Sequence, residues 1–249
     1  MKEFGLIGKE LSHSFSASYF NNKFIAKGIE AIYNLFDLDN VSLFKHLLSR
    51  QNLSGLNVTS PYKREVIPFL NELSEEAKKI NAINVIEFIR KDTGELILKG
   101  HNTDSKGFDL TLNGISDING ALILGTGGAS SAVALALERR QIPCKVVSRC
   151  PAGKEISYDE MNSLITSHKL IINATPVGMY PKEGVCPDID YSAISSYNVC
   201  YDLIYNPSET IFLKKSKAQG AKTLNGLQML INQAELAWEI WNKNEREDT

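Results

Sequence analysis

The sequence predicts an α/β protein with two lobes, each built on a sheet of mainly parallel strands. Strand-like and helix-like segments alternate along almost the whole chain, which is typical of parallel strands joined by helical crossovers. A first strand series ends near Leu98, and a second begins at Ala121 with a glycine-rich loop directly behind its first strand. Two sheets in a chain of 249 residues indicate two lobes, with a ligand-binding cleft between them.

In the first series, short runs rich in β-branched and aromatic residues alternate with helical patterns. Asp92-Thr93-Gly94 has the composition of a hairpin turn. The expected strands are Phe4–Ile7, Ala31–Asp37, Gly55–Thr59, Asn84–Ile89 and Glu95–Leu98, and the expected helices are Ala17–Lys27, Leu43–Leu48 and Ser74–Ile80.

The second series ends in a helix near Gly226–Trp241 that is apolar on two sides. Its polar arc holds Asn232 and Glu235, whereas Gln233 falls inside the apolar region and needs a backbone group or a ligand as partner. The expected strands of this series are Ala121–Leu124, Lys145–Val147, Leu170–Asn173, Val199–Leu203 and Ala221–Leu224.

The composition is that of a soluble globular protein, with 43% hydrophobic and 22% charged residues. A net charge of -2 predicts no binding of nucleic acid or of an anionic membrane surface. No apolar run approaches the roughly 18 residues of a membrane span. The 4 cysteines and 4 histidines show no zinc-ligand spacing, so we expect no metal site and a reduced, cytoplasmic protein.

The loop Gly125–Ser130 follows an apolar strand and opens an alanine-rich helix. Glycines permit a tight turn and the close approach of a pyrophosphate, which then meets the free N–H groups at the helix N-terminus. Ser130 replaces the third glycine of the usual fingerprint, but strand, loop and helix occur in the required order. The loop therefore favours a Rossmann-type dinucleotide site over a plain strand-to-helix turn.

The end of the next strand indicates which dinucleotide binds. A carboxylate there would bind the ribose 2′-hydroxyl of NAD, but this chain has Ser148 and Arg149, with no acidic residue until Glu155. The planar guanidinium of Arg149 matches phosphate oxygens, and Ser148 supplies a hydroxyl donor. NADP is therefore favoured over NAD. The alternative is that Arg149 lies on a solvated loop and binds no phosphate.

Polar residues follow several strands of the first lobe. Ser14 and Ser16 lie at a helix N-terminus, where hydroxyls and amides can bind a carboxylate, although serine also caps helices for local stability. Lys63 falls in the first helical turn after Pro61, the unfavourable end of the dipole for a cation. Asp104 opens another helix, either as its N-cap or as a functional carboxylate. A Lys63/Asp104 pair in the cleft could transfer protons near neutral pH.

Nine segments, in this order, resemble the shikimate dehydrogenase family and together span nearly the whole chain. They are SHSFS, NVTSPYK, NAIN, GHNTDSKG, GTGGAS, Ser148-Arg149, INATPVGM, YDLIYNPSET and NGLQMLINQAELAW. Each alone is a weak signal, whereas the ordered set is specific.

The resemblance implies a substrate-binding catalytic domain of residues 1–101 with 226–249 and an NADP-binding Rossmann domain of residues 102–225. It also implies Lys63 and Asp104 as the catalytic pair. The implied substrate-binding residues are Ser14, Ser16, Thr59, Asn84, Asn102, Tyr201 and Gln233, and the implied cofactor-binding residues are Gly125, Gly127, Gly128, Ala129, Ser148, Arg149, Gly226 and Met229.

The implied reaction is the NADPH-dependent, reversible reduction of 3-dehydroshikimate to shikimate in aromatic amino acid (chorismate) biosynthesis, by a monomer or a homodimer. We expect Lys63 to supply or relay the proton to the carbonyl oxygen and Asp104 to orient it, with either group as the one that transfers the proton. One alternative is a quinate/shikimate dehydrogenase that uses NAD. Another is a non-catalytic NADP-binding sensor, which would not need the intact set of Lys63, Asp104 and Gln233.

The chain departs from the family's usual pattern at a few positions. Prolines that the family usually has near Glu10 and Ala17 are absent. Asn81 and Val85 stand where a glycine and a threonine are more common, and Cys150 replaces a threonine that often follows the cofactor arginine. None of these changes removes a proposed catalytic group.

Overall fold

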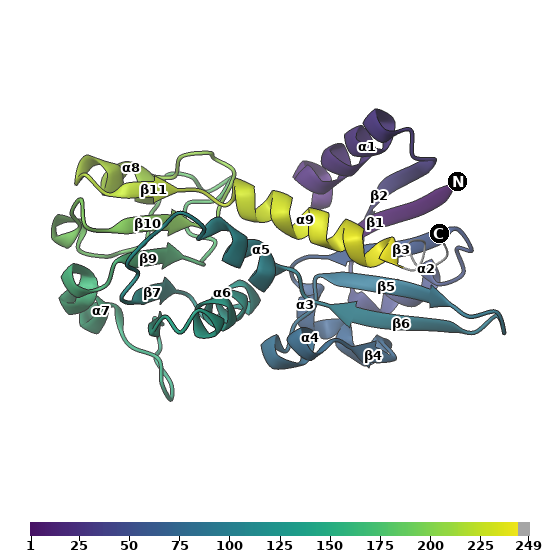
Figure 1. The fold of residues 1–249 in the computed structure, drawn as a ribbon, viewed down its shortest axis with the longest axis horizontal. Helices are drawn as coiled ribbons and strands as arrows, with labels where there is room; N and C mark the ends of the chain where they lie inside the picture. The colour runs from purple at the N-terminus through teal and green to yellow at the C-terminus, as the bar shows by residue number, and fades with distance from the viewer. Residues whose placement is uncertain (244–249) are drawn as a thin grey trace. The chain divides into compact units, whose positions relative to one another are not determined.

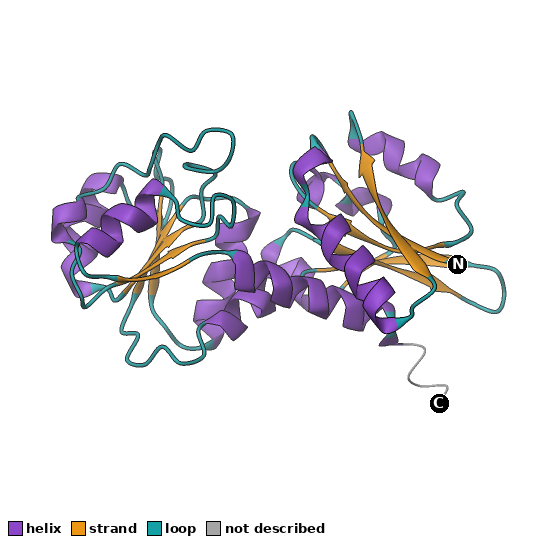
Figure 2. Cartoon of the chain, turned by 90° about the horizontal axis from the view of Figure 1, so that it is seen from above, coloured by secondary structure: helices purple, strands orange, loops and turns teal. Residues whose placement is uncertain are grey.

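The computed structural model describes residues 1–243 and divides into two compact units (Figures 1 and 2). Unit 1 contains Met1–Thr103 and the chain from Ala234 onward, and unit 2 contains Asp104–Gln233. From the sequence, the chain was expected to return from the second domain to the first between residues 225 and 226. In the structure this return lies eight residues later, between Gln233 and Ala234. The difference arises because the start of the last helix packs in unit 2, as described below. Residues 244–249 of the expected first domain lie outside the described residues.

Unit 1 is built on a mixed sheet (Figure 1). Its strands are β1 (Lys2–Gly8), β2 (Ala31–Asp37), β3 (Leu53–Val58), β4 (Glu72–Leu73), β5 (Val85–Arg90) and β6 (Leu96–His101), and its helices are α1 (Phe15–Lys27), α2 (Phe44–Leu47), α3 (Tyr62–Glu65) and α4 (Glu75–Ile80). The strand order is β2-β1-β3-β5-β6-β4. β1 runs parallel to β2 and β3, whereas β5 runs antiparallel to β3 and β6. The β5–β6 turn lies at the expected Asp-Thr-Gly segment.

The two faces of this sheet carry separate clusters of buried side chains, because successive strand residues point to opposite faces. One cluster includes Phe44 of α2 and Tyr62 of α3. The other includes Phe20 of α1 and Trp241, the last residue of α9 (Leu227–Trp241). The Trp241 indole donates a hydrogen bond of 3.1 Å to the Ile86 carbonyl oxygen. The end of α9 is thereby fixed to the sheet of unit 1.

Unit 2 is built on a parallel sheet (Figure 1). Its strands are β7 (Ala121–Leu124), β8 (Cys144–Val147), β9 (Leu170–Asn173), β10 (Val199–Asp202) and β11 (Lys222–Leu224), and its helices are α5 (Asp104–Thr111), α6 (Gly128–Arg139), α7 (Tyr158–Leu164), α8 (Ile211–Ala218) and the first part of α9. The order is β11-β10-β9-β7-β8, with all neighbours parallel. The chain winds outward from β7 to β8 and then returns to β9 on the other side. This reversal makes the carboxyl ends of β7 and β9 the expected ligand-binding point of the sheet.

Helices cover both faces of the unit 2 sheet. Met161 of α7 and Phe212 of α8 pack with one set of strand residues, and Phe108 of α5 and Val133 of α6 pack with the alternate set. Met229 of α9 belongs to the second cluster. The beginning of α9 is therefore part of the unit 2 core.

The strands β2, β7 and β9 begin and end where the sequence predicts, and most other elements differ by only a few residues. The two-residue edge strand β4 was not predicted, because so short a strand shows no period in the sequence. Two residues of the polar arc of α9 are bound within the protein. Glu235 accepts hydrogen bonds from Tyr19 and Lys23, and Asn232 donates one of 3.0 Å to the Gly107 carbonyl oxygen. Within residues 1–243, no helix combines the length and apolarity required to cross a bilayer.

Candidate active site

Ser14 and Ser16 lie at the N-terminus of α1. Ser14 is the N-cap, and its hydroxyl accepts a hydrogen bond of 3.3 Å from the Ser16 amide, so the capping role is realised. Ser16 is buried in the first turn. Burial raises the pKa of Tyr33 well above its usual value, and a hydrogen bond with Ser16 acts against this rise. The Tyr33 hydroxyl also donates to Asn57 Oδ1 at 2.7 Å, which extends the polar cluster from α1 to β3.

Lys63 is half-buried and is the second residue of α3, in the first turn as the sequence predicts. Its carbonyl oxygen accepts a hydrogen bond of 2.8 Å from the Ile83 amide, which lies next to Asn84 in the chain. Thr59 is half-buried directly after β3, and its carbonyl oxygen accepts from the Tyr62 amide at 3.0 Å. Backbone hydrogen bonds therefore connect the segment of Thr59 and Lys63 with the segment of Asn84.

Asn84 and Asn102 are both buried. Asn84 Oδ1 accepts from the Thr103 amide at 2.8 Å, and Asn84 Nδ2 donates to the Thr103 hydroxyl at 2.9 Å. Asn102 Nδ2 donates to the Ala82 carbonyl oxygen at 3.0 Å. The two side-chain amides thus bind the segment of residues 82–84 to the segment of residues 101–103. This is a structural role in addition to the predicted contact with substrate. Predicted residues Lys63, Asn84 and Asn102 belong to one hydrogen-bonded region of unit 1.

Asp104 directly follows Thr103 and is the first residue of unit 2. Asp104 is 6% exposed, and α5 begins at this position. A carboxylate in the first turn is favoured by the positive end of the helix dipole. The backbone of Asp104 is one peptide bond away from a residue that Asn84 fixes in two places.

The glycine loop has the geometry that a pyrophosphate site needs. Gly125 has a φ of 105°, which favours glycine, and Gly127 is the N-cap of the 12-residue helix α6. A Cβ added at Gly127 would meet no atom within 4 Å among the described residues, so open space lies in front of the helix. Gly128 and Ala129 form its first turn. Backbone N–H groups at such a terminus suit a phosphate.

Ser148 and Arg149 follow β8 at the same edge of the sheet as the glycine loop. The Gly125 amide donates to the Val147 carbonyl oxygen at 2.9 Å, so the two segments are neighbours. Ser148 Oγ accepts from the Cys150 amide at 3.2 Å and keeps its own hydrogen for donation to an anion. Arg149 is exposed. These residues fit the phosphates of a dinucleotide that carries a 2′-phosphate.

Gly226 directly precedes α9, and Met229 and Gln233 lie in the part of α9 that belongs to unit 2. A Cβ at Gly226 would lie 1.9 Å from the Leu203 carbonyl oxygen, so only glycine fits there. Met229 is 7% exposed and packs in the core. Gln233 Nε2 donates to the Leu230 carbonyl oxygen at 3.1 Å, which is the backbone partner that its position in the helix requires.

Tyr201 is only 1% exposed, and its ring packs edge-on against Phe108 at 5.2 Å between centroids. Burial raises the pKa of Tyr201 to about 12, and its buried hydroxyl has no hydrogen-bond partner among the described residues. The predicted contact of Tyr201 with substrate stays a prediction. Tyr205, four residues later and half-buried beyond the end of β10, is the more accessible tyrosine of the same segment.

A buried polar group at the carboxyl ends of β9 and β10 was not predicted from the sequence. Asn173 and Asp202 end these strands and are both 0% exposed, and the Asp202 carboxylate accepts a hydrogen bond of 2.6 Å from the Thr210 hydroxyl. The signal in the sequence is a polar residue that closes an otherwise apolar strand, at the edge where ligands bind.

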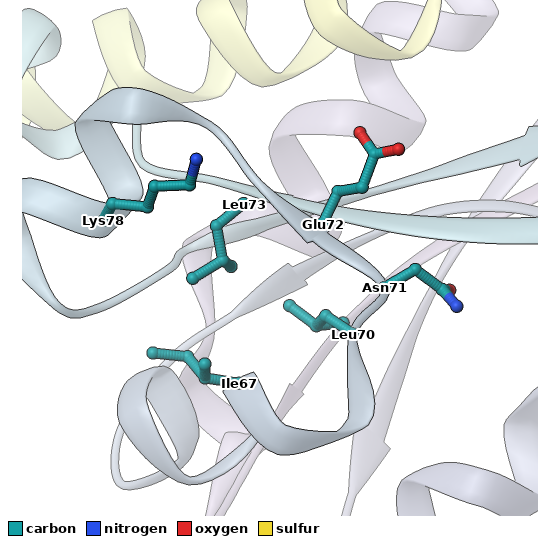
Figure 3. Close-up of a pocket in the computed structure, with 6 residues that line it drawn as sticks. All are labelled: Ile67, Leu70, Asn71, Glu72, Leu73 and Lys78. Atoms are coloured by element: carbon teal, nitrogen blue, oxygen red, sulfur yellow. The ribbon is translucent and has the colours of Figure 1, made fainter.

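A surface pocket of about 510 Å³ lies in unit 1 (Figure 3). Figure 3 shows Leu70, Leu73 and Ile67 as its apolar lining, with the ends of Glu72 and Lys78 directed away from them. It contains none of the residues that the sequence predicts for the site. Among residues 1–243, no three histidine, cysteine or acidic side chains form a group that could hold a metal ion.

Comparisons with known proteins place the chain in a family. Residues 6–86 match the model of the shikimate dehydrogenase substrate binding domain. A shikimate dehydrogenase (NADP(+)) of Carboxydothermus hydrogenoformans is 39% identical over 95% of this chain and 90% of its own length. The chain belongs to the shikimate dehydrogenase family.

Solved structures of the shikimate dehydrogenase family have the same fold. The shikimate 5-dehydrogenase of Thermus thermophilus, in complex with NADP(H) and shikimate, has a TM-score of 0.85 and 30% identity, and the match covers 98% of this chain and 94% of that one. The quinate dehydrogenase of Corynebacterium glutamicum, in complex with NAD, also has a TM-score of 0.85, with 27% identity over 97% and 94% of the two chains. The two-lobed α/β fold expected from the sequence, with a Rossmann-type lobe, is confirmed.

One departure from the common pattern of the shikimate dehydrogenase family has a plain physical reason. Asn81, where a glycine is more usual, is the C-cap of α4 and has a φ of 54° and a ψ of 40°. Asparagine is the residue other than glycine that most readily adopts this left-handed conformation. The exchange therefore keeps the turn that leads into Asn84.

Proposed function

We propose that this chain catalyses the NADP-dependent, reversible reduction of 3-dehydroshikimate to shikimate in aromatic amino acid (chorismate) biosynthesis. The observation that carries the proposal is the similarity over 95% of the chain to a shikimate dehydrogenase (NADP(+)), which includes the segments of both predicted sites. In this proposal most of the substrate residues lie in unit 1, and the cofactor residues lie in unit 2. The cytoplasmic location and the monomeric or homodimeric state expected from the sequence stay predictions.

The proposed cofactor residues are those of the glycine loop and of the end of β8. The N-terminus of α6, at Gly127, Gly128 and Ala129, would bind the pyrophosphate through its N–H groups. Arg149 and Ser148 would bind the 2′-phosphate, which NAD lacks. Bound NADPH supplies the hydride. Gly226 and Met229 are proposed to lie on the nicotinamide side, at the start of α9.

The proposed substrate residues present hydroxyl and amide groups to a polyhydroxylated ring acid. Ser14 and Ser16 would bind the carboxylate at the N-terminus of α1, where backbone N–H groups add to the hydroxyls. The ring hydroxyls are proposed to bind Thr59, Asn84, Asn102, Tyr201 and Gln233. A pocket lined by such groups rejects analogues that leave them unpaired.

Lys63 is the proposed proton donor. As negative charge develops on the carbonyl oxygen, a positioned ammonium group stabilises that charge and can transfer a proton to it. Asp104 is proposed to orient Lys63 and to accept a hydrogen bond from a substrate hydroxyl. In the reverse direction the same groups remove the proton from the hydroxyl of shikimate.

The test is the Lys63→Ala variant, assayed for NADPH formation with shikimate and for NADP binding. We expect turnover to fall by about 100-fold or more, as for the loss of a general acid–base group, with NADP affinity unchanged. The control is Lys78→Ala, which removes an exposed lysine of the same unit that pairs with Glu75. Turnover of Lys63→Ala close to that of the control would remove Lys63 from the mechanism.

A second candidate function is quinate/shikimate dehydrogenase activity with NAD, which the likeness to the quinate dehydrogenase in complex with NAD favours. Arg149 and the lack of an acidic residue at the end of β8 argue against it, because NAD is usually bound there by a carboxylate. Quinate also carries an extra hydroxyl at the carbon that bears its carboxylate. A tight pocket at Ser14 and Ser16 should disfavour that hydroxyl.

A further inference from the structure

Asp202 is a buried carboxylate at the carboxyl end of β10, and the proposed reaction gives it no role. It is 0% exposed. Its donors are the Thr210 hydroxyl at 2.6 Å, the Ile204 amide at 3.0 Å and Asn173 Nδ2 at 3.1 Å. All three are neutral groups. Burial raises the pKa of Asp202 to about 6, and these three hydrogen bonds act against that rise.

A carboxylate in this position is costly for the fold. An ionised group without a cationic partner is expensive to bury, and an apolar residue at the end of an apolar strand would avoid that cost. Groups of this kind gather at functional sites more often than elsewhere. The geometry around Asp202 indicates what the carboxylate does there.

On one side, Asp202 is connected to the start of α9. Its Oδ1 holds the Ile204 amide, and the Ile204 carbonyl oxygen accepts from the Gly226 amide at 3.0 Å. The Cα of Gly226 lies so close to Leu203 that a Cβ would be 1.9 Å from the Leu203 carbonyl oxygen. Gly226 is thus seated on residues 203–204, and its carbonyl oxygen accepts from the Leu230 amide in the first turn of α9.

On the other side, Asp202 is connected to the glycine loop. Asn173, which donates to Asp202, uses its Oδ1 to accept from the Thr175 amide at 3.1 Å and the Thr175 hydroxyl at 2.6 Å. A Cβ added at Gly125 would lie 2.9 Å from Thr175 Cγ2, so Thr175 packs directly on this glycine. The network therefore extends from the glycine loop to the start of α9, entirely within unit 2.

We propose that Asp202 is a positioning residue for the reaction, which sets Gly226 and the start of α9 relative to the glycine loop. This inference rests on the proposed function, in which Gly226 and Met229 lie at the nicotinamide and Gln233 at the substrate. Asp202 touches neither ligand in this proposal. It acts through Ile204 on the helix and through Asn173 on the loop. Small displacements of groups that align two reactants cost large factors in rate.

The experiment compares Asp202→Ala and Asp202→Asn in the full-length chain. The asparagine keeps an oxygen for Ile204 and Asn173 and can donate its amide to Thr210, so it preserves the geometry without the charge. We expect Asp202→Ala to lower kcat by about tenfold or more, and Asp202→Asn to stay within about threefold of wild type. NADP affinity should change less than kcat in Asp202→Ala, because Ser148 and Arg149 are untouched.

Amide hydrogen exchange at Gly226 reports how stably its N–H is bonded to the Ile204 carbonyl oxygen, without reference to activity. We expect faster exchange at Gly226 in Asp202→Ala but not in Asp202→Asn. Asp190→Ala is the matched control, since Asp190 also accepts from a hydroxyl and an amide, both of Ser192, and has no connection to α9 among its hydrogen bonds. It should leave both readouts unchanged. If Asp202→Ala does not yield folded protein, Thr210→Val, which removes one donor, should show the same changes in smaller size.

Two results would overturn the inference. One is an Asp202→Ala enzyme with wild-type kcat and wild-type exchange at Gly226. The other is an equal loss in Asp202→Ala and Asp202→Asn, since the preserved geometry should rescue a positioning residue. If wild type forms no NADPH with shikimate, the proposed function fails, and the exchange comparison still decides whether Asp202 sets Gly226.

Discussion

The pH dependence of stability offers a quantitative test of the environment of Asp202. Asp202→Asn removes an ionisable group that is 0% exposed and keeps its size. In the folded protein burial raises the pKa of Asp202 from 3.8 to about 6. Hydrogen bonds from Thr210, Ile204 and Asn173 oppose this rise. The folded state therefore holds the proton more tightly than the unfolded state does. Wild type loses stability relative to the variant as pH rises from about 4 through about 6.

The size of this effect follows from the two pKa values. Their difference, about 6 minus 3.8, is about 2 units, which corresponds to roughly 3 kcal/mol. About 2 kcal/mol of that change falls between about pH 4.5 and about pH 7.5. The neighbouring Cys200 and Tyr191 do not interfere, because burial raises the pKa of Cys200 to about 11 and that of Tyr191 further above its usual value.

The assay is urea denaturation of wild type and Asp202→Asn, followed by far-UV circular dichroism at several pH values in this range. The free energy of unfolding of the variant minus that of wild type should grow as pH rises. Asp190→Asn is the control, because hydrogen bonds from Ser192 lower the pKa of the exposed Asp190, so its titration falls below this pH range and its difference from wild type should stay flat. A difference for Asp202→Asn that is independent of pH, or that shrinks as pH rises, would refute the account of a buried, proton-binding carboxylate.

Three further predictions concern the two predicted sites. Arg149→Ala should raise the KM for NADP by about 10- to 100-fold and leave the KM for NAD unchanged, because a charge-assisted bond to phosphate is lost; equal effects on both cofactors in steady-state kinetics would contradict this role. Asn84→Ala should lower the free energy of unfolding by about 1–3 kcal/mol in urea titrations, because the buried Thr103 amide loses its acceptor, and wild-type stability would argue against that. Gly226→Ala should reduce kcat by about tenfold or more, because its Cβ would lie 1.9 Å from the Leu203 carbonyl oxygen and would displace the start of α9. An unchanged kcat would mean that the reaction tolerates this displacement of α9.

Periodicity and turn chemistry were sufficient to predict the fold of both units. The apolar strands β7 and β9 have sharp ends in the sequence, and both were placed at their observed bounds. Gly120 and Gly125 flank β7, whereas β9 begins after Lys169 and closes with Asn173. The edge strand β4 has only two residues, and its pairing with β6 comes from tertiary structure, which no local pattern records. The boundary of the units within α9 was not predictable either, because a continuous helix shows no break in sequence where its packing partner changes.

The candidate site was predictable where one chemical type stands at a strand end or a helix start. The glycine loop and Arg149 belong to this class, and the structure has them at neighbouring strand ends. Roles that depend on several distant segments were not predictable. Asn84 was expected to contact substrate and is also the residue that fixes Thr103. Asp202 was noted only as part of a family segment, because its role depends on Asn173 and Thr210, which pair with it only in the folded chain.

The reaction and its cofactor are tested most directly by following the absorbance of reduced nicotinamide with the purified chain, using shikimate and quinate, each with NADP and with NAD. We predict that shikimate with NADP gives the highest kcat/KM, by about tenfold or more over each other combination. Faster reaction with quinate and NAD, or no reduction of nicotinamide in any combination while NADP still binds, would contradict the account.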